Sequence, residues 1–480
     1  SETYGRLLDA DLTLLPNVAQ GDDSGDYIDA GSENDFVAGD NARFERRDGS
    51  DSSLSERMRV LEETTIYGEL ISGPNGETND GDALVTLDSQ LNPTGAVARV
   101  VQLLAHSDDD ANSTSHGDDY IVGGPNHDLL FGQLGNDVIQ GDGLILLDDT
   151  TLQINLNVEH GFRTGDEDTD GNVILVRDAN SYYTLNAVSA GRDDAGYLQV
   201  NPSFEADSDG DDYIEGNGGD DVIFGNLGQD DIVGGSSTLF GLAGPETLRP
   251  DGRDLIFGGA GTDIARNDEG GDNHGEVVDE NHGIDADVIV GDNANIYRLV
   301  GINQTDSGGF LNFQYDQGYS IRIIPRAVEH IDYTEGGPDY DSTVLDPDGD
   351  NGASDEIHGE SGDDQIYGQT GDDVLFGEAQ DDDLIGGWGN DFISGGTGQD
   401  GVLGDDGRIY TSRNTAPADR NDTGLSEPLY NIGKVEETYI STPGRIQEAI
   451  INVEGELKKS VNLTPFNVDP ITEMQDAKFD

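Results

Sequence analysis

Apolar residues recur singly, every nine positions, in a background of glycine and acidic residues. Each lies two places after an aspartate. The longest unbroken run has six copies, with aspartates Asp355, Asp364, Asp373, Asp382, Asp391 and Asp400 and apolar partners Ile357, Ile366, Leu375, Leu384, Ile393 and Val402. Six copies in strict register do not arise by chance, even in an acid-rich chain. Self-similarity at a fixed period is the signature of an array of similar structural units.

The same register continues outside that run. It places further aspartates at Asp26 and Asp35, at Asp119, Asp128 and Asp137, and at Asp212, Asp221 and Asp230. Asp254, Asp263 and Asp287 also fit if two fifteen-residue loops are inserted, because the gaps before Asp254 and before Asp287 are both 24 residues. We therefore count 17 copies, in blocks of two, three, six and six.

The residue types within one copy predict its local structure. Its glycines allow left-handed backbone, so six residues can make a tight turn. The three residues around the apolar position then form a short strand that points one side chain inward. Two copies complete a coil of about 18 residues, and coils stack at roughly 4.8 Å like strands in a sheet. The turns should form two columns, with Asp355, Asp373 and Asp391 on one edge and Asp364, Asp382 and Asp400 on the other.

The segments between the blocks lack the nine-residue period. Each begins with a similar exit phrase: GDNARFER at 39–46, GDGLILLD at 141–148, GDNANIYR at 291–298 and GDDGRIYT at 404–411. We interpret these segments as β-hairpins or small sheets inserted into one continuous roll, rather than as several independent domains. The predicted fold class is all-β: a parallel β-roll spine of nine-residue repeats with inserted excursions.

This organisation sets the following boundaries: an N-terminal strand segment at 1–20, roll block 1 at 21–41, excursion 1 at 42–115, roll block 2 at 116–143, excursion 2 at 144–208, roll block 3 with two inserted loops at 209–293, excursion 3 at 294–351, roll block 4 at 352–406, and a C-terminal excursion or tail at 407–480.

The net charge of the chain indicates that the predicted roll needs bound counterions. The 480 residues include 99 Asp and Glu against 24 Lys and Arg, a formal charge of −75. A nucleic-acid partner is excluded because phosphate binding needs a basic surface. The chain has no cysteine, which rules out disulfides and thiolate metal sites. No stretch approaches the ~18 apolar residues of a membrane span, so we expect no membrane insertion.

Carboxylates and turn carbonyls should converge between stacked turns, and an all-oxygen cage of six to eight ligands suits calcium. We therefore expect multiple Ca²⁺ ions as cofactors. Two acidic loops are further candidates. GDEDTDGNV at 165–173 begins like a calcium loop, although Arg177 stands where an EF-hand needs a glutamate, and the second loop contains Asp346, Asp348 and Asp350. Each of the two loops is consistent with a calcium-stabilised turn and with a plain acidic loop. Besides the 17 repeat aspartates, the candidate ligand residues are Gly259, Gly261, Gly387, Gly389, Gly396, Gly398, Asp166, Asp168, Asp170, Asp346, Asp348 and Asp350.

The turns resemble the RTX (hemolysin-type, repeats-in-toxin) calcium-binding β-roll. The segments Gly258–Asp263, Gly386–Asp391 and Gly395–Asp400 match its Gly-Gly-x-Gly-x-Asp consensus in full, whereas Gly377–Asp382 and Gly123–Asp128 have lost glycines. The resemblance implies secretion of bacterial type, an extracellular or cell-surface location, disorder without calcium, and folding in millimolar calcium.

No enzyme motif accompanies the repeats. The eight histidines include no His-Glu-x-x-His, and no Gly-x-Ser-x-Gly occurs. We expect a non-enzymatic structural protein, such as an adhesin stalk, a surface-layer component or a matrix filament subunit. The alternative is a secreted hydrolase whose excursions carry an unrecognised active site. Trp388, at a variable turn position, is expected to be exposed, either for contact with a cell surface or polysaccharide or as an incidental aromatic.

The ends of the sequence suggest self-association. The opening SETYGRLLDADLTLLPN echoes EETYIS at 436–441, and the last excursion does not return to a roll. We expect either a segment cut from a tandem array, or a subunit whose tail completes the next subunit by strand addition. Such a heterologous contact builds filaments or arrays.

Overall fold

In a computed structural model of the protein, the described residues are 25–47, 56–59, 64–67, 83–85, 99–104, 106, 116–147, 163–167, 173–178, 181–186, 188–206, 208–262, 283–299, 323–324, 326–333, 350–414, 434–435, 438–439, 450–454 and 457–462. Every structural statement below concerns these residues.

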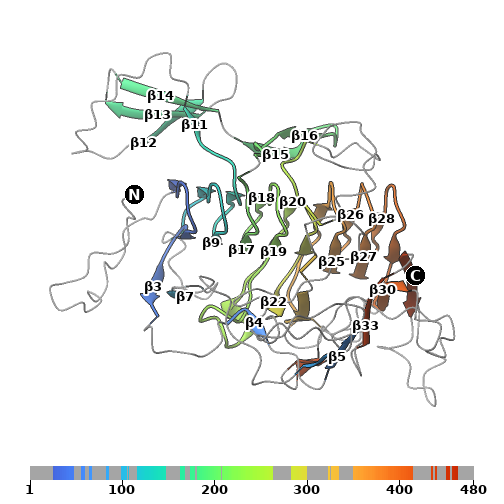
Figure 1. The fold of residues 1–480 in the computed structure, drawn as a ribbon. Helices are drawn as coiled ribbons and strands as arrows, with labels where there is room; N and C mark the ends of the chain where they lie inside the picture. Colours follow the sequence, from blue (N-terminus) through green and yellow to red (C-terminus); the bar gives the residue numbers. More distant parts are fainter. Residues whose placement is uncertain are drawn as a thin grey trace.

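The spine consists of two parallel eight-stranded sheets (Figure 1). Roll sheet I contains, in order, β1 (Tyr27–Asp29), β8 (Tyr120–Val122), β10 (Val138–Gln140), β18 (Val222–Phe224), β20 (Leu255–Phe257), β24 (Glu356–His358), β26 (Val374–Phe376) and β28 (Phe392–Ser394). Roll sheet II contains β2 (Phe36–Ala38), β9 (Leu129–Leu134), β17 (Tyr213–Gly218), β19 (Asp231–Val233), β21 (Val288–Val290), β25 (Gln365–Thr370), β27 (Asp383–Trp388) and β29 (Gly401–Leu403). The chain alternates strictly between the sheets, so the predicted parallel β-roll is confirmed.

All four repeat blocks contribute strands to both sheets, and the spine is therefore continuous. Within the last block, partners in the parallel register are 18 residues apart, as in the pair Glu356 and Val374. Elsewhere the excursions lengthen this step without disturbing the register, because Leu255 still pairs with Glu356 across 101 residues. The interpretation of one roll with insertions fits this arrangement better than independent domains do.

The apolar residue of each repeat points between the two sheets. These residues form one narrow core that includes Ile121, Ile139, Ile214, Ile223, Ile256, Ile289, Ile357 and Ile366, all fully buried. Burial of an aliphatic side chain of this size contributes roughly 1.5–3 kcal/mol relative to exposure. One inward residue per copy is therefore enough to hold the sheets together along the spine.

The excursions pack on the outer faces of the sheets. On roll sheet II lie β3 (Ala42–Arg46) with β7 (Arg99–Leu103), and β22 (Ala294–Leu299) with β23 (Arg326–His330) and β4 (Met58–Arg59). A hairpin of β15 (Ser189–Arg192) and β16 (Leu198–Asn201) lies on roll sheet I. The other elements are β5 (Thr64–Tyr67), β6 (Ala83–Val85), β11 (Leu146–Leu147), β12 (Arg163–Glu167), β13 (Val173–Asp178), β14 (Ser181–Asn186), β30 (Arg408–Asn414), β31 (Lys434–Val435), β32 (Thr438–Tyr439), β33 (Ile450–Glu454), β34 (Leu457–Asn462) and the 3₁₀ helix η2 (Glu246–Leu248).

Two sequence predictions need correction. The described roll has sixteen strands rather than seventeen, because β19 pairs directly with β21 and Asp230 bonds directly to Asp287, which leaves no place between them for a copy at Asp263. Asp263 itself lies outside the described residues. Trp388 is half-buried rather than exposed, and its indole nitrogen is buried, because the residue is the last one of β27 and pairs with Thr370.

Candidate metal sites

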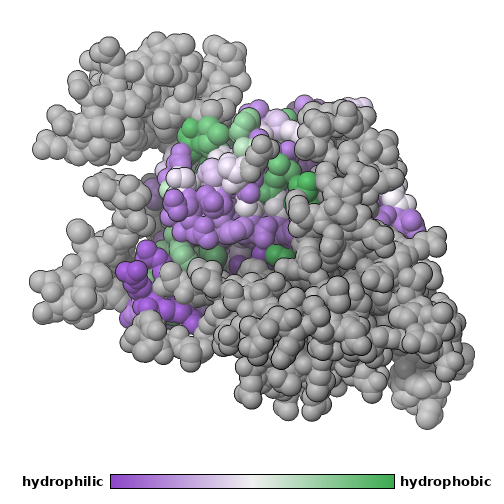
Figure 2. All heavy atoms as spheres, in the orientation of Figure 1, coloured by the Kyte–Doolittle hydropathy of each residue, from purple (hydrophilic) through white to green (hydrophobic). Residues whose placement is uncertain are grey.

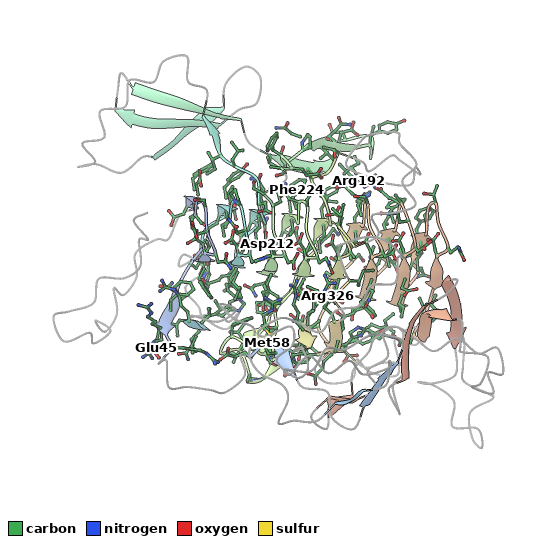
Figure 3. The ribbon with its side chains drawn as sticks, viewed as in Figure 1. Glu45, Met58, Arg192, Asp212, Phe224 and Arg326 are labelled. Carbon is green, nitrogen blue, oxygen red and sulfur yellow. The ribbon has the colours of Figure 1, made fainter. Side chains whose placement is uncertain are left out.

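Sixteen repeat aspartates form two hydrogen-bonded columns along the spine. In each column, the backbone N–H of one aspartate donates to Oδ1 of the aspartate one coil further along, at 2.6–3.2 Å. Column I runs through Asp26, Asp119, Asp137, Asp221, Asp254, Asp355, Asp373 and Asp391. Column II runs through Asp35, Asp128, Asp212, Asp230, Asp287, Asp364, Asp382 and Asp400. The predicted separation onto two edges is thus confirmed, and Figure 3 labels Asp212 between the two rows of strands.

The second carboxylate oxygen of these residues has a different environment. In Asp128, Asp137, Asp212, Asp221, Asp230, Asp254, Asp287, Asp355, Asp364 and Asp373, Oδ2 is buried and has no hydrogen-bond partner among the described residues. Burial of a carboxylate oxygen without a partner is costly unless a proton or a cation satisfies it. These oxygens therefore point to a missing positive charge.

Turn carbonyls lie beside these oxygens. A Cβ added to Gly216, the first residue of its turn, would lie 2.5 Å from Asp221 Oδ2 and 2.5 Å from the carbonyl oxygen of Gly234 in the next coil. The same crowding of an aspartate Oδ2 and a glycine carbonyl occurs at Gly132, Gly225, Gly359 and Gly368. Glycine is thus required at the first turn position because two oxygens occupy the space where a side chain would be.

The candidate glycines shape the turn backbone. Gly387, Gly389, Gly396 and Gly398, at the second and fourth turn positions, have φ of 104°, 153°, 91° and 123°. Gly261 has φ of 78°. A Cβ on Gly259 would lie 2.5 Å from Oε2 of Glu360, the movable end of a side chain.

Turns that have lost their consensus glycines keep the same backbone conformation, which is strained for other residue types. In the turn before Asp382, Glu378 and Gln380 replace the two glycines and adopt φ of 75° and 78°. Left-handed backbone costs a non-glycine residue of this kind about 1 kcal/mol or more. The stacking of coils therefore imposes the turn geometry even where the sequence does not favour it.

Electrostatics of the columns follow from burial and from the neighbouring aspartates. Burial, followed by the charge of Asp221, raises the pKa of Asp137 to about 10. Burial likewise raises the pKa of Asp128, Asp221 and Asp373 to about 8. For Asp212, burial and then the nearby Asp230 hold the pKa well above its usual range. Without a bound cation these carboxyls would therefore be mainly protonated at neutral pH, and a cation that binds in the columns would displace their protons.

The ligand chemistry fits a hard cation held partly by main-chain oxygens. Among the described residues, no three acidic or histidine side chains converge on one metal-sized point. A cation in a column must therefore take carboxylate oxygens together with turn carbonyls such as those of Gly216 and Gly234. An all-oxygen set on flexible turns suits calcium, which accepts six to eight oxygen ligands in irregular geometry.

A second hydrogen-bonded ladder was missed by sequence reasoning. The residue just before many of the column aspartates accepts a hydrogen bond from the following coil: Asn136 N–H donates to Asp118 Oδ1 at 3.0 Å, and Asn390 N–H donates to Asp372 Oδ1 at 2.9 Å. Here the donor is in the later coil, whereas in the columns the donor is in the earlier coil. The signal was present in the sequence, because Asn, Asp, Gln, Ser or His often precedes the repeat aspartate.

Two aspartates of the exit phrases, Asp142 and Asp292, are also buried next to the columns. Asp142 Oδ2 accepts from the N–H of Gly210 at 3.0 Å, and Asp292 Oδ2 accepts from the N–H of Thr370 at 2.6 Å. Burial, then neighbouring aspartates, raises the pKa of Asp142 to about 10. Burial raises that of Asp292 to about 7. The exit phrases therefore fasten the point where the chain leaves the roll to the adjacent coil.

The remaining candidates are less well placed. Asp168, Asp170, Asp346 and Asp348 lie outside the described residues. Asp166 belongs to β12, of which only the backbone is described, and Asp350 is half-buried at the start of the last block. Their role as ligands stays a prediction.

Comparison with protein families gives one match, to the RTX calcium-binding nonapeptide repeat (4 copies), over residues 16–42, 115–143, 207–237, 350–384 and 367–402. These segments cover the uninterrupted parts of the columns, and the coils with inserted turns between Asp254 and Asp287 lie outside them. The chain therefore carries hemolysin-type repeats of a family that binds calcium. No curated protein and no solved structure matches the chain.

Proposed function

We propose that this chain is a secreted, non-enzymatic structural protein whose β-roll becomes rigid when calcium binds. It would act as an adhesin stalk, a surface-layer component or a subunit of an extracellular matrix filament. The observation that supports this most directly is the pair of aspartate columns. They run through eight coils without interruption, whatever length of chain is inserted between successive coils.

The proposal rests on a linkage between metal binding and folding. With a formal charge of −75, the chain pays heavily for bringing its carboxylates together. Calcium that binds only the folded columns contributes its binding free energy to folding. Extracellular modules typically bind calcium at ~10⁻⁴–10⁻³ M, far above its cytoplasmic concentration. We therefore expect the chain to fold after export.

The excursions suit a role as surface modules. Because they cover the outer faces of the spine, they rather than the columns would meet a partner. Contact with a cell surface or a polysaccharide through an excursion, and self-association through the terminal strands, are parts of the proposal. The N-terminal segment 1–20 lies outside the described residues.

A calcium titration of the full chain tests the proposal. We expect circular dichroism to show coil without calcium, β-structure in millimolar calcium, and a return to coil with EGTA. Asp373→Asn should raise the calcium midpoint about tenfold or more, because it removes a buried ligand charge. A chain that keeps its β-structure in EGTA would overturn the proposal.

Asp372→Asn is the matched control. Asp372 precedes Asp373, is almost fully exposed, and caps the next coil as an asparagine can. We expect a much smaller change in the calcium midpoint. Equal effects of the two substitutions would mean that general acidity, rather than the columns, binds the ion.

A further inference from the structure

Among the described residues, the first and last strands of each roll sheet have no partner strand on their outer side, although β29 also contacts β30 and β34. β1 and β2 end the sheets on one side, β28 and β29 end them on the other, and each of these four strands has a single neighbour in its roll sheet. In Figure 1 the roll strands follow one another along the spine up to β28. Such edges present backbone N–H and C=O groups that can pair with another strand.

One apolar residue of the core and one of the outer face are exposed at the later end. Val402 holds the inward position of β29 but is 40% exposed, whereas the equivalent Leu384 and Ile366 are fully buried. Phe392 of β28 is 58% exposed. At the earlier end, Ile28 is only partly buried against the core. Solenoids normally need a polar cap where the stack ends, and these positions have the character of a continuing stack.

The two ends are complementary in shape. In parallel register, β28 would meet β1 and β29 would meet β2. The aromatic pair of Phe392 and Tyr27 would repeat the stacking of Tyr27 on Tyr120, whose ring centroids are 5.7 Å apart. Gly401, the smallest residue of β29, would face Phe36, the largest residue of β2. The resulting pairs are Phe392 with Tyr27, Ile393 with Ile28, Ser394 with Asp29, Gly401 with Phe36, Val402 with Val37 and Leu403 with Ala38.

Basic side chains gather at the earlier end beside the exposed acids Asp26, Asp29 and Glu33, and Arg43 there pairs with Glu45. The hairpin of β3 and β7 presents the exposed side chains of Arg43, Arg46 and Arg99 close to β2, with Arg99 lying 5.8 Å over the ring of Phe36. Figure 3 places Glu45 of β3 at this end of the molecule, and Figure 2 shows a strongly hydrophilic patch there. The opposite end carries Asp405 and Asp406 directly after β29. In a chain with only 24 basic residues, three at one end are a marked concentration.

We propose that a second copy of this chain stacks on the first, head to tail, so that β28 and β29 of one copy pair with β1 and β2 of the next. The contact is heterologous and therefore repeats into a filament along the roll axis. It differs from strand addition by the terminal segments, because the repeats themselves form the junction. It would also extend both aspartate columns across the junction. The inference rests on the calcium-folded roll of the proposed function.

Engineered cysteines provide a direct test, because the natural chain has none. In the stacked register Ser394 and Asp29 lie opposite each other, and directly paired positions of adjacent strands are about 4.8 Å apart, within the Cα separation that disulfides accept. The variant Asp29→Cys/Ser394→Cys of the full chain should give a ladder of disulfide-linked dimers, trimers and larger species in millimolar calcium. A paired junction holds the thiols at ~mM effective concentration, so at a chain concentration of ~1 µM cross-linking should be roughly a thousandfold faster than by random collision.

The matched control moves one thiol off the axis. Tyr197, in the turn of the β15–β16 hairpin, is exposed but lies away from both edges. Asp29→Cys/Tyr197→Cys should therefore cross-link no faster than random collision. Each single-cysteine variant alone should give no ladder, whereas a mixture of Asp29→Cys with Ser394→Cys should stop at dimers.

Sedimentation velocity supplies an independent measurement. Val402→Asp places a charge where a side chain is already partly exposed, so it should leave the calcium-dependent circular dichroism unchanged and abolish the larger species. Calcium-induced folding without a cross-linked ladder would overturn the stacking and leave the proposed function standing. Such a result would mean that the terminal segments or a further part of a longer chain cover the ends. Absence of calcium-induced folding would instead overturn the proposed function.

Discussion

The outer faces of the two roll sheets differ sharply, although their inner faces are alike. On roll sheet II, a large apolar cluster joins the strands to several excursions and includes Phe131, Tyr213, Val290, Ile296 and Val328. On roll sheet I, one short hairpin covers a smaller cluster, and Phe392 at the far end is exposed. The repeat thus determines the inward residue and the turn, and the residues that point outward determine which insertion packs on each face.

Roll sheet II is joined to its excursions by a buried ion cluster as well as by apolar packing. Asp231 of β19 accepts from Arg298 Nε at 2.6 Å and from Arg326 Nε at 2.8 Å. Arg57, from a different excursion, forms a third ion pair with it and lies 3.9 Å over the ring of Tyr213. Burial alone raises the pKa of Asp231, but the three guanidinium groups outweigh it and hold the pKa well below its usual range.

Roll sheet I uses an aromatic stack instead. Phe224, Phe257, His358 and Phe376 follow one another on neighbouring strands, with ring centroids 4.8–5.1 Å apart and nearly parallel planes. His358 also hydrogen-bonds to Glu378 at 2.9 Å and to Glu356 at 3.1 Å. Arg192 of the hairpin makes a bidentate pair with Glu356 at 2.7 Å, which fastens the hairpin to the sheet.

Removal of the shared acceptor on roll sheet II should have the largest effect. Asp231→Ala leaves three arginines without their partner in a buried site, which typically costs about 3–5 kcal/mol. We expect the thermal midpoint at fixed, saturating calcium to fall strongly, and excursion 3 to become protease-sensitive. Asp194→Ala, in the exposed turn of the hairpin, is the control and should change neither. An unchanged midpoint for Asp231→Ala would show that the excursions are not held by this cluster.

On roll sheet I, the stability that His358 contributes to the stack should depend on pH. Burial alone lowers the pKa of His358, but the hydrogen bonds that it donates to Glu356 and Glu378 outweigh it and raise the pKa to about 9. A raised pKa means that this stabilisation is complete below the unfolded value of about 6.5 and is lost as the pH rises through about 9. The difference corresponds to about 3 kcal/mol.

The thermal midpoint of the natural chain in saturating calcium should therefore fall between pH 7 and pH 9.5. His358→Gln should start lower and lose most of this slope. If both proteins show the same slope, another group titrates in that range.

The smallest effect is expected at the hairpin fastening. The side chain of Arg192 is 46% exposed, and exposed ion pairs contribute about 0.2–1 kcal/mol. Arg192→Ala should leave the thermal midpoint nearly unchanged but speed amide hydrogen exchange in β15 and β16. Arg253→Ala removes another exposed arginine of the roll and should leave that exchange unaffected. A large drop in the midpoint for Arg192→Ala would mean that the hairpin supports the whole sheet.

Periodicity was sufficient to predict the two sheets, the inward residues and the two columns, because each depends on spacing within 18 residues. It failed where the repeat is interrupted: Asp263 has the correct spacing, yet column II passes directly from Asp230 to Asp287. The Asp231 cluster could not be predicted, because its arginines come from residues 67 to 174 positions away in two excursions. The excursion boundaries and the acidic loop candidates stay predictions.

The unequal spacing of the columns gives the protein a defined response to stretching. Tension along the roll axis pulls coil from coil, and each coil that opens releases the chain between two successive column aspartates. From Asp355 to Asp373 this is 18 residues, but from Asp254 to Asp355 it is 101. At ~3.5 Å per extended residue the released lengths are about 60 Å and about 350 Å. Under load the spine would therefore lengthen in short and long steps, and the excursions would serve as reserves of slack stored between stiff coils.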